Sequence, residues 1–215
     1  MQHHQQQYKV AVATLQGRPY YEITHALKQM GIRYDSISPE ESADSDCKVI
    51  ITTLDEVGII SGRKAVMLDT ELAKYPVIAK AKILRNIAGP QADDQLIVGI
   101  DPGNRIGISV MYLHEEVAST VESSPASAVE QISAVLGGIV SHRKMVKIGD
   151  GNIKMALSMA WAIKKKFNDV EIEIVDEHGT SRPQTNEVNR RGIRDRVSAR
   201  TIAFRHGRPY YLSQR

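Results

Sequence analysis

Cysteine and long apolar runs are the features that this 215-residue chain lacks most plainly. With one cysteine, Cys47, it cannot form an internal disulfide, so we expect a cytoplasmic protein. No apolar run approaches the ~20 residues of a membrane-spanning helix, and the polar start MQHHQQQ has no signal-peptide core. These absences predict a protein without a membrane partner. Cysteine and histidine at zinc-binding spacing are also missing.

Charge is distributed unevenly along the chain, whose composition otherwise suits an ordinary folded protein. Hydrophobic residues make up 42%, enough for a sizeable core. Residues 178–215 hold nine arginines, no lysine and two acids, a net charge of +7, so the remainder carries −4. Because arginine forms forked contacts with phosphates, this asymmetry predicts a nucleic-acid surface. The alternatives are a solvated basic tail and a network of ion pairs.

Residues 1–90 read as a small α/β domain of unknown role. Strands are predicted at 8–15, 33–37, 48–53 and 64–68, and helices at 19–30 and 76–88. We find no glycine-rich phosphate motif here and interpret Asp55, Glu56 and Asp69 as ordinary loop acids. The small, polar segment AGPQADD at 88–94 is the predicted linker. The sequence RPYY occurs at 18–21 and again at 208–211, which we treat as coincidence.

Residues 95–215 form a second predicted domain with the element order βββαβαβα. Strands are expected at 96–101, 106–113, 115–122, 144–149 and 170–175, and helices at about 125–142, 152–167 and 193–206. Both later crossovers pass through a helix, so these strands should be parallel to the first. This order predicts a mixed five-stranded sheet with helices on both faces.

The stretch LIVGIDPGNRIGISVM, at 96–111, lies at the centre of this second domain. Its apolar strand is predicted to lie mid-sheet and ends in Asp101. An acid there is costly to bury without a partner. A metal ion, a basic side chain and simple exposure are the three interpretations left open. Gly103 and Gly107 lack a Cβ and would allow a phosphate backbone to approach.

Further acids follow the other parallel strands. Asp150 ends the fourth strand, Asp176 and Glu177 end the fifth, and Asp195 lies early in the last helix. Carboxyl ends of parallel strands meet at one edge, where Mg²⁺ or Mn²⁺ relieves carboxylate repulsion. Two such ions could clamp a phosphodiester.

Each of these acids also has a structural interpretation. Asp150 could cap the next helix, and Glu177 could be a solvated turn residue. Asp195 could neutralise its arginine neighbours. Asp176 could pair with Arg182 or Arg205.

The motifs resemble those of a nuclease superfamily. GIDPG and its hairpin, at 99–107, look like the first motif of RuvC-type Holliday-junction resolvases and YqgF-type relatives, which are ribonuclease H-like. VDEHGT at 175–180 and RDRVSARTIA at 194–203 are similar to later family motifs, so the resemblance covers roughly 96–206. The Asp101–Gly107 spacing is one residue shorter than in most resolvases and is more similar to an archaeal, uncharacterised branch. His178 replaces the family's arginine, and Arg200 lies where small residues are common.

The resemblance implies a ribonuclease H-like fold and a Mg²⁺- or Mn²⁺-dependent nuclease acting on structured DNA or RNA, as Holliday-junction resolvases do. Its implied catalytic and metal-binding positions are Asp101, Asp150, Glu177 and Asp195. The residues predicted to bind nucleic acid are Arg105, Arg182, Arg190, Arg191, Arg194 and Arg196. A homodimer is possible by the same resemblance. The alternative is a non-catalytic nucleic-acid-binding protein that keeps the fold. An actin-like phosphotransferase would need a second phosphate loop and a large adenosine domain, for which there is no room.

Overall fold

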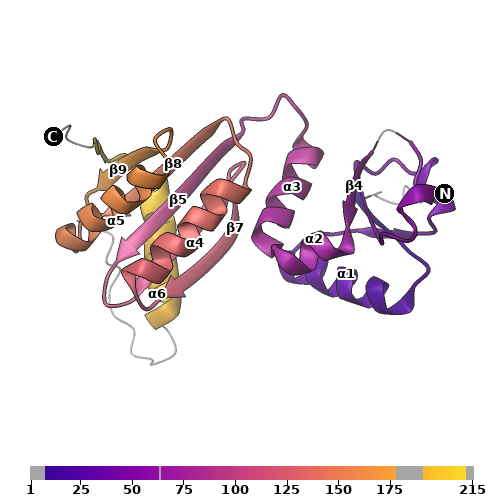
Figure 1. The fold of residues 1–215 in the computed structure, drawn as a ribbon, viewed down its shortest axis with the longest axis horizontal. Coiled ribbons are helices and arrows are strands. Elements are labelled where there is room, and N and C mark those ends of the chain that lie inside the picture. The colour runs from indigo at the N-terminus through magenta and orange to yellow at the C-terminus, as the bar shows by residue number, and fades with distance from the viewer. Residues whose placement is uncertain (1–7, 63, 178–190, 212–215) are drawn as a thin grey trace, which may run out of the picture. The chain divides into compact units, whose positions relative to one another are not determined.

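The computed structural model describes residues 8–62, 64–177 and 191–211, and the chain divides into two compact units, Met1–Ala92 and Asp93–Arg215. Each unit has its own β-sheet (Figure 1). The boundary falls between Ala92 and Asp93. The next residue, Asp94, accepts hydrogen bonds at its backbone carbonyl from Ser141 Oγ (2.8 Å) and the Arg143 N–H (3.4 Å). Asp94 therefore belongs to the second unit.

The first unit is built on a four-stranded parallel sheet with the order β2-β1-β3-β4. Every residue of β1 and β3 is buried, which explains the apolar sequence VAVA of β1 and the VII that begins β3. The strands are β1 (Val10–Ala13), β2 (Asp35–Ile37), β3 (Val49–Thr52) and β4 (Ala65–Leu68). The α-helices are α1 (Gly17–Met30), α2 (Asp69–Lys74) and α3 (Pro76–Ala88), with short 3-10 turns at Glu40–Ser42 and Val57–Ile59.

Two of the acids interpreted as ordinary loop residues have structural roles in the first unit. Glu56 is 9% exposed, and its carboxylate accepts hydrogen bonds from the Leu15 N–H and the Thr53 hydroxyl, both at 2.8 Å. Burial alone would raise its pKa, but these bonds and one from Thr14 outweigh burial and lower it. Glu56 thus connects the loops that follow β1 and β3. Asp69 begins α2, a helix that the sequence interpretation missed.

The second unit contains a six-stranded mixed sheet with the order β10-β9-β8-β5-β6-β7. Strands β5, β8 and β9 are mutually parallel, which confirms the prediction from the helical crossovers. Strand β6 pairs antiparallel with both β5 and β7. The strands are β5 (Gln95–Pro102), β6 (Ile106–Tyr112), β7 (Glu115–Glu122), β8 (Arg143–Gly149), β9 (Glu171–Val175) and β10 (Arg208–Pro209).

The predicted number of five strands was wrong because of β10, a two-residue strand that pairs antiparallel with β9. A strand this short leaves no periodicity for a sequence pattern to reveal. Its residues open the second RPYY sequence, whereas the first RPYY lies within α1. The two copies therefore have no common structure, in keeping with coincidence.

Helices cover both faces of this sheet (Figure 1). Helices α4 (Pro125–Gly138) and α5 (Ile153–Lys166) pack side by side on one face, and α6 (Arg191–Phe204) lies across the other. Ser124 caps α4 by accepting a hydrogen bond from the Ser127 N–H. The helix ends at Gly137–Gly138, earlier than the predicted residue 142, since paired glycines favour termination. Within the described part of the chain, no helix combines the length and apolarity needed to cross a lipid bilayer.

Helix α6 approaches the sheet closely because glycines lie beneath it. A Cβ on Gly99 of β5 would collide with the Ala199 carbonyl and lie 2.8 Å from the Ala203 Cβ. A Cβ on Gly107 of β6 would collide with the Asp195 carbonyl. The expectation that Gly107 makes room for a phosphate backbone was therefore wrong: its space is taken by α6. This packing brings Asp195 to the end of the sheet where β5 terminates.

Candidate functional site

Asp101 occupies the end of β5 on the face covered by α6. It is paired in register with Gly107, so its side chain shares that face with the glycine. The pKa of Asp101 is raised from 3.8 to about 6, first by burial and then by repulsion from Glu177 and Asp195. A hydrogen bond from the Ser198 hydroxyl acts in the opposite direction. Glu177 and Asp195 are thus close enough to Asp101 to oppose its ionisation.

Glu177 lies just beyond β9, folded over the loop that follows β8. A Cβ on Gly149 would collide with its carboxylate, and one on Gly151 would lie 2.5 Å from its Oε2. Only glycines at these two positions leave room for the acid, so the sequence Gly-Asp-Gly forms a recess for it. Burial raises the pKa of Glu177 and repulsion from Asp150 adds to this, while a hydrogen bond from the Gly151 backbone and the charge of Arg205 lower it.

Asp150 is tied to the neighbouring strand end through the backbone. Its N–H donates to the Val175 carbonyl at 3.0 Å, and its Oδ1 accepts from the Glu177 N–H at 3.1 Å. The alternative that Asp150 caps the next helix is wrong. Asn152 is the N-cap of α5, and its side chain accepts from the Met155 N–H. Asp150 and Glu177 therefore hold the ends of β8 and β9 together.

Two functional candidates escaped the sequence interpretation. Ser198 lies three residues after Asp195, hence on the same side of α6, and bonds to Asp101. The helical spacing could have revealed it. Arg208 of β10 places Nη2 4.0 Å from Asp150 Oδ2. No sequence signal indicated this contact, because it depends on the pairing of β10 with β9.

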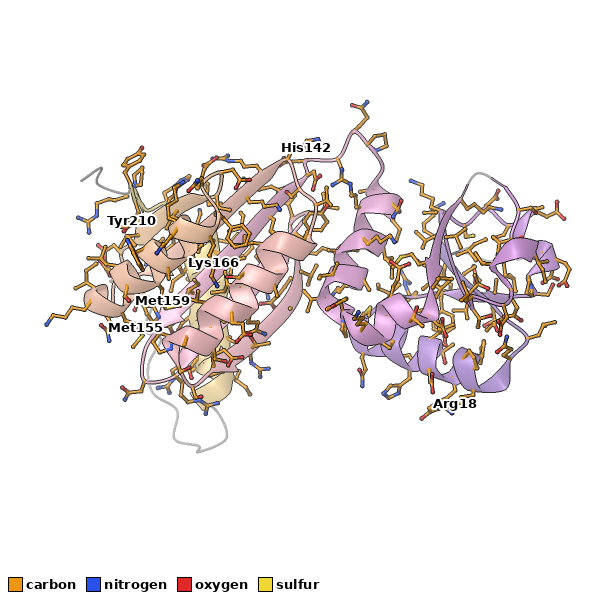
Figure 2. All side chains as sticks on the ribbon, viewed as in Figure 1. Arg18, His142, Met155, Met159, Lys166 and Tyr210 are labelled. Carbon is orange, nitrogen blue, oxygen red and sulfur yellow. The ribbon has the colours of Figure 1, made fainter. Side chains whose placement is uncertain are left out.

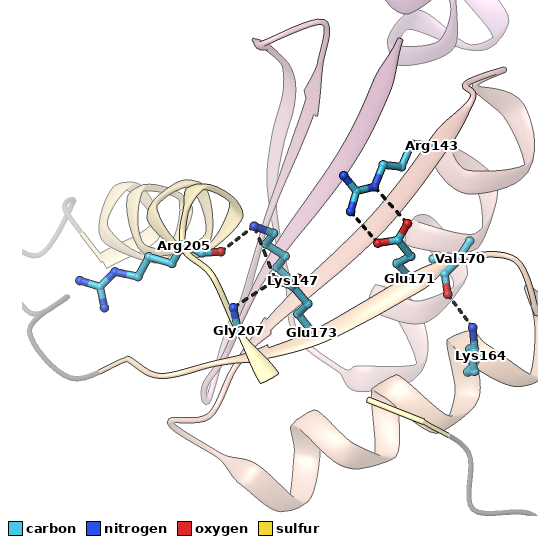
Figure 3. Close-up of polar contacts among 8 residues, drawn as sticks. All are labelled: Arg143, Lys147, Lys164, Val170, Glu171, Glu173, Arg205 and Gly207. Atoms are coloured by element: carbon cyan, nitrogen blue, oxygen red, sulfur yellow. Dashed lines mark hydrogen bonds and ion pairs between the residues drawn. The ribbon is translucent and has the colours of Figure 1, made fainter. Parts of the chain in front are cut away.

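The position of Arg208 depends on a set of polar contacts among Lys147, Glu173, Arg205 and Gly207, which we call the Lys147 latch (Figure 3). Lys147 is 6% exposed; its Nζ donates to the Arg205 carbonyl at 2.6 Å and lies 3.6 Å from Glu173 Oε2. The same Glu173 oxygen accepts from the Gly207 N–H at 3.1 Å. Arg205 in turn donates to the backbone carbonyl of Asp176 at 3.0 Å. The latch fixes the segment after α6 against β9.

The predicted phosphate-binding arginines are placed only in part. Arg105, exposed at the tip of the β5–β6 hairpin, lies beside Gly192 at the start of α6. Arg194 and Arg196 are exposed on the first turns of that helix, and Arg196 Nε donates to the Gly192 carbonyl. These three cations lie near the end of the helix that carries Asp195. Arg182, Arg190 and the side chain of Arg191 fall outside the described residues.

The acid edge, which we define as Asp101, Asp150, Glu177 and Asp195, suits a hard divalent cation in its donor chemistry. All its side chains are carboxylates, and burial, together with repulsion from neighbouring acids, raises the pKa of Asp101 and Glu177. A cation relieves that repulsion. Across the described residues, however, no three His, Cys, Asp or Glu side chains are already grouped as metal ligands. Carboxylates of the acid edge would have to move together to hold one.

Comparison with known proteins gives no family assignment. No protein-family model and no curated protein sequence matches the chain. Among solved structures, an X-ray structure of Marinitoga piezophila Argonaute with a 5′-OH guide RNA aligns with 78% of this chain and 39% of that chain, at 12% identity and a TM-score of 0.26. This chain therefore spans well under half of that Argonaute. So low a TM-score does not establish a common fold.

Proposed function

We propose that the second unit is a ribonuclease H-like, divalent-metal-dependent nuclease that hydrolyses phosphodiesters in structured DNA or RNA. The observation that carries the proposal is the electrostatic coupling of Asp101 to Glu177 and Asp195, which come from three separate elements. Placing like charges together in a half-buried position is unfavourable unless a cation is bound. The element order and the motifs around Asp101, Glu177 and Asp195 support the same class of enzyme.

Each acid has a distinct part in this proposal. Asp101 is central, since it interacts with both Glu177 and Asp195, and these three would hold Mg²⁺ or Mn²⁺ with Asp150. When bound, such an ion lowers the pKa of a coordinated water and stabilises charge on a leaving oxygen. Ser198 would orient the Asp101 carboxylate by its hydrogen bond. Arg105, Arg194 and Arg196 would contact substrate phosphates, which positions the substrate without selecting a sequence.

The test is an Asp101→Asn substitution, which keeps the size of the side chain and removes its charge. We expect wild-type protein to cleave branched DNA or structured RNA in Mg²⁺ or Mn²⁺, and the variant to lose at least a hundredfold in rate. Asp93→Asn is the matched control, because Asp93 is 74% exposed beside His114, outside the acid edge. Equal rates for wild type and Asp101→Asn would contradict the proposal.

A second readout does not depend on activity. Crystals soaked in Mn²⁺ should show anomalous scattering at Asp101 in the wild type and none in the Asn variant. Mn²⁺ should also raise the melting temperature of the wild type alone. If the protein binds nucleic acid but takes up no metal by either measure, it is the non-catalytic binding protein of the alternative hypothesis.

A further inference from the structure

An exposed, acid-free surface extends from the acid edge along α5 and β10. Helix α5 contains four lysines and no acid, and residues 205–211 contain two arginines and no acid. The α5–β10 strip, as we define it, consists of Lys154, Leu157, Trp161 and Lys165 of α5 with Arg208 and Tyr210 at the β10 edge. Large apolar side chains here stay open to solvent: Trp161 is 52% exposed and Leu157 42%.

Helical geometry places the α5 residues of the strip away from both α4 and the sheet. The flank of α5 toward α4 carries Met155, Met159 and Lys166 (Figure 2). On this flank Lys166 Nζ donates to Ser133 Oγ of α4 at 3.5 Å. At 100° per residue, Lys154, Trp161 and Lys165 project together on the outer face, and Leu157 lies on the flank toward β10. Helix α5 packs on β8 and β9, so β10 borders that flank.

The register of β10 places its side chains on the α5 side of the sheet. Arg208 is paired with Ile174, and the Tyr210 N–H donates to the Ile172 carbonyl at 2.8 Å. Directly opposed residues point to the same face, and both isoleucines are buried on the face that α5 covers. Arg208, 82% exposed, also lies 4.0 Å from Asp150, so one end of the strip meets the acid edge.

We infer that the α5–β10 strip binds single-stranded nucleic acid and guides an unpaired strand to the acid edge. Trp161 offers a stacking surface that any base can use, since every base has a π-face. Lys165 Nζ lies over one face of that ring, 5.0 Å from its centroid, which leaves the other face for a base and keeps a cation close to the phosphates of a stacked strand. The bases of a duplex are already stacked on one another, so the strip selects unpaired segments.

Charge and shape favour this occupant over a protein. An apolar stripe alone would suit many partners, but the strip carries three exposed cations, Lys154, Lys165 and Arg208, together with the exposed ring of Trp161. The absence of acids across both segments matches a polyanion. The inference rests on the proposed nuclease function for its substrate class, but its binding test requires no cleavage.

Trp161 is the only tryptophan in the chain, so its fluorescence reports on the strip alone. The full chain in EDTA is titrated with a 15-nucleotide oligo-dT and with a duplex of equal length. Saturable quenching by oligo-dT, and much weaker quenching by the duplex, is the expected result. In anisotropy measurements with labelled oligo-dT, Trp161→Ala should weaken binding by about 5- to 150-fold, and Trp161→Phe should restore most of it.

Tyr75→Ala is the matched control, because Tyr75 of the first unit is 53% exposed and has Lys74 Nζ 5.2 Å from its ring centroid. It should bind oligo-dT as wild type does. Replacing Lys165 and Arg208 by alanine should make the slope of the logarithm of the binding constant against the logarithm of salt concentration shallower by about 1.4. This assumes ~0.7 for each phosphate contact on a single strand. All these side chains are exposed, and melting curves would verify that each variant is folded.

Several results would overturn the inference. The first is an oligo-dT affinity that Trp161→Ala leaves unchanged. The second is a change in Trp161 fluorescence with phosphatidylserine vesicles but not with oligo-dT, which would make the strip a membrane surface. The third is a dimer, seen by sedimentation, that Trp161→Ala dissociates without altering oligo-dT binding.

Cleavage of duplex substrates without oligo-dT binding would refute the inference about the strip and leave the proposed function standing. If the strip binds oligo-dT but the Asp101→Asn variant cleaves as fast as wild type, the proposed function would be refuted and the inference about the strip would stand.

Discussion

Two buried or half-buried acids show how the environment of a single residue decides its role. Glu56 receives hydrogen bonds from Thr14, Leu15 and Thr53 that lower its pKa despite burial, so it stabilises loops of the first unit as an anion. Asp101 is half-buried and faces two like charges, so its pKa rises to about 6 despite a hydrogen bond from Ser198. Hydrogen bonds from the protein stabilise the charged form of Glu56, whereas the charged form of Asp101 would be stabilised by a bound cation.

The raised pKa of Asp101 predicts a specific dependence of stability on pH. Because the folded protein holds this proton more tightly than the unfolded chain, the free energy of unfolding should fall as the pH rises from about 4 to about 6. In EDTA at pH 7, Asp101→Asn should therefore be as stable as wild type or up to about 1–2 kcal/mol more stable, after allowance for solvent screening.

Urea unfolding of both proteins at pH 4, 5, 6 and 7 measures this effect. The difference between variant and wild type should grow over that range and level off above it. Asp93→Asn provides the baseline for replacing an exposed carboxylate. A variant less stable than wild type at pH 7 would show that Asp101 contributes favourable interactions as an anion.

At the level of elements, α6 is the helix on which the acid edge depends. It delivers Asp195 and Ser198 to Asp101 only because Gly99 and Gly107 let it lie directly on β5 and β6. Its C-terminal end is held by the Lys147 latch, which also sets β10 in place. The helix thus connects the acid edge with the segment that carries Arg208.

Gly99→Ala should separate α6 from the sheet, because the new Cβ has no space beside Ala199 and Ala203. We expect a loss of about 2–4 kcal/mol in the free energy of unfolding, the scale of overpacking and strain in a core. Gly137→Ala is the control: it lies within α4 with open space around it and should stabilise by up to ~1 kcal/mol. Thermal or urea unfolding compares the two, and equal effects would show that α6 does not press on Gly99.

At the level of the whole molecule, the chain forms two compact units, each with its own β-sheet. Between the end of α3 at Ala88 and the anchored Asp94, the short segment at 89–93 has no helix or strand and includes exposed Pro90, Gln91 and Asp93. Polar, exposed backbone without regular structure is the preferred substrate of proteases.

Limited digestion with proteinase K should therefore cut first within residues 89–93 and leave two resistant fragments. Mass spectrometry would identify the cut, and each fragment should retain its own cooperative melting transition. First cleavage inside α3 or β5, or a fragment that resists digestion across the segment, would indicate that the units share a core.

Hydrophobic patterning determined much of this structure from the sequence alone. Apolar runs, Pro and Gly at helix ends, and the βββαβαβα order correctly predicted the strands of the second unit through β9, its three helices and the parallel pairing of β5, β8 and β9. The position of Asp101 after a buried strand followed from the same local pattern. These features depend on short-range propensity and on the rule that helical crossovers join parallel strands.

Only the tertiary structure decided what surrounds those residues. Helix α6 occupies the space above Gly99 and Gly107, and the Glu177 carboxylate occupies the space above Gly149 and Gly151. The need for glycine at these positions is seen only in the folded structure. The roles of Glu56 and Ser198 depend on donors and acceptors from other elements, and β10 and Arg208 depend on pairing between segments more than thirty residues apart in the chain. Local sequence encodes propensity and burial, whereas close approach, pKa and edge pairing arise from atoms that meet only after folding.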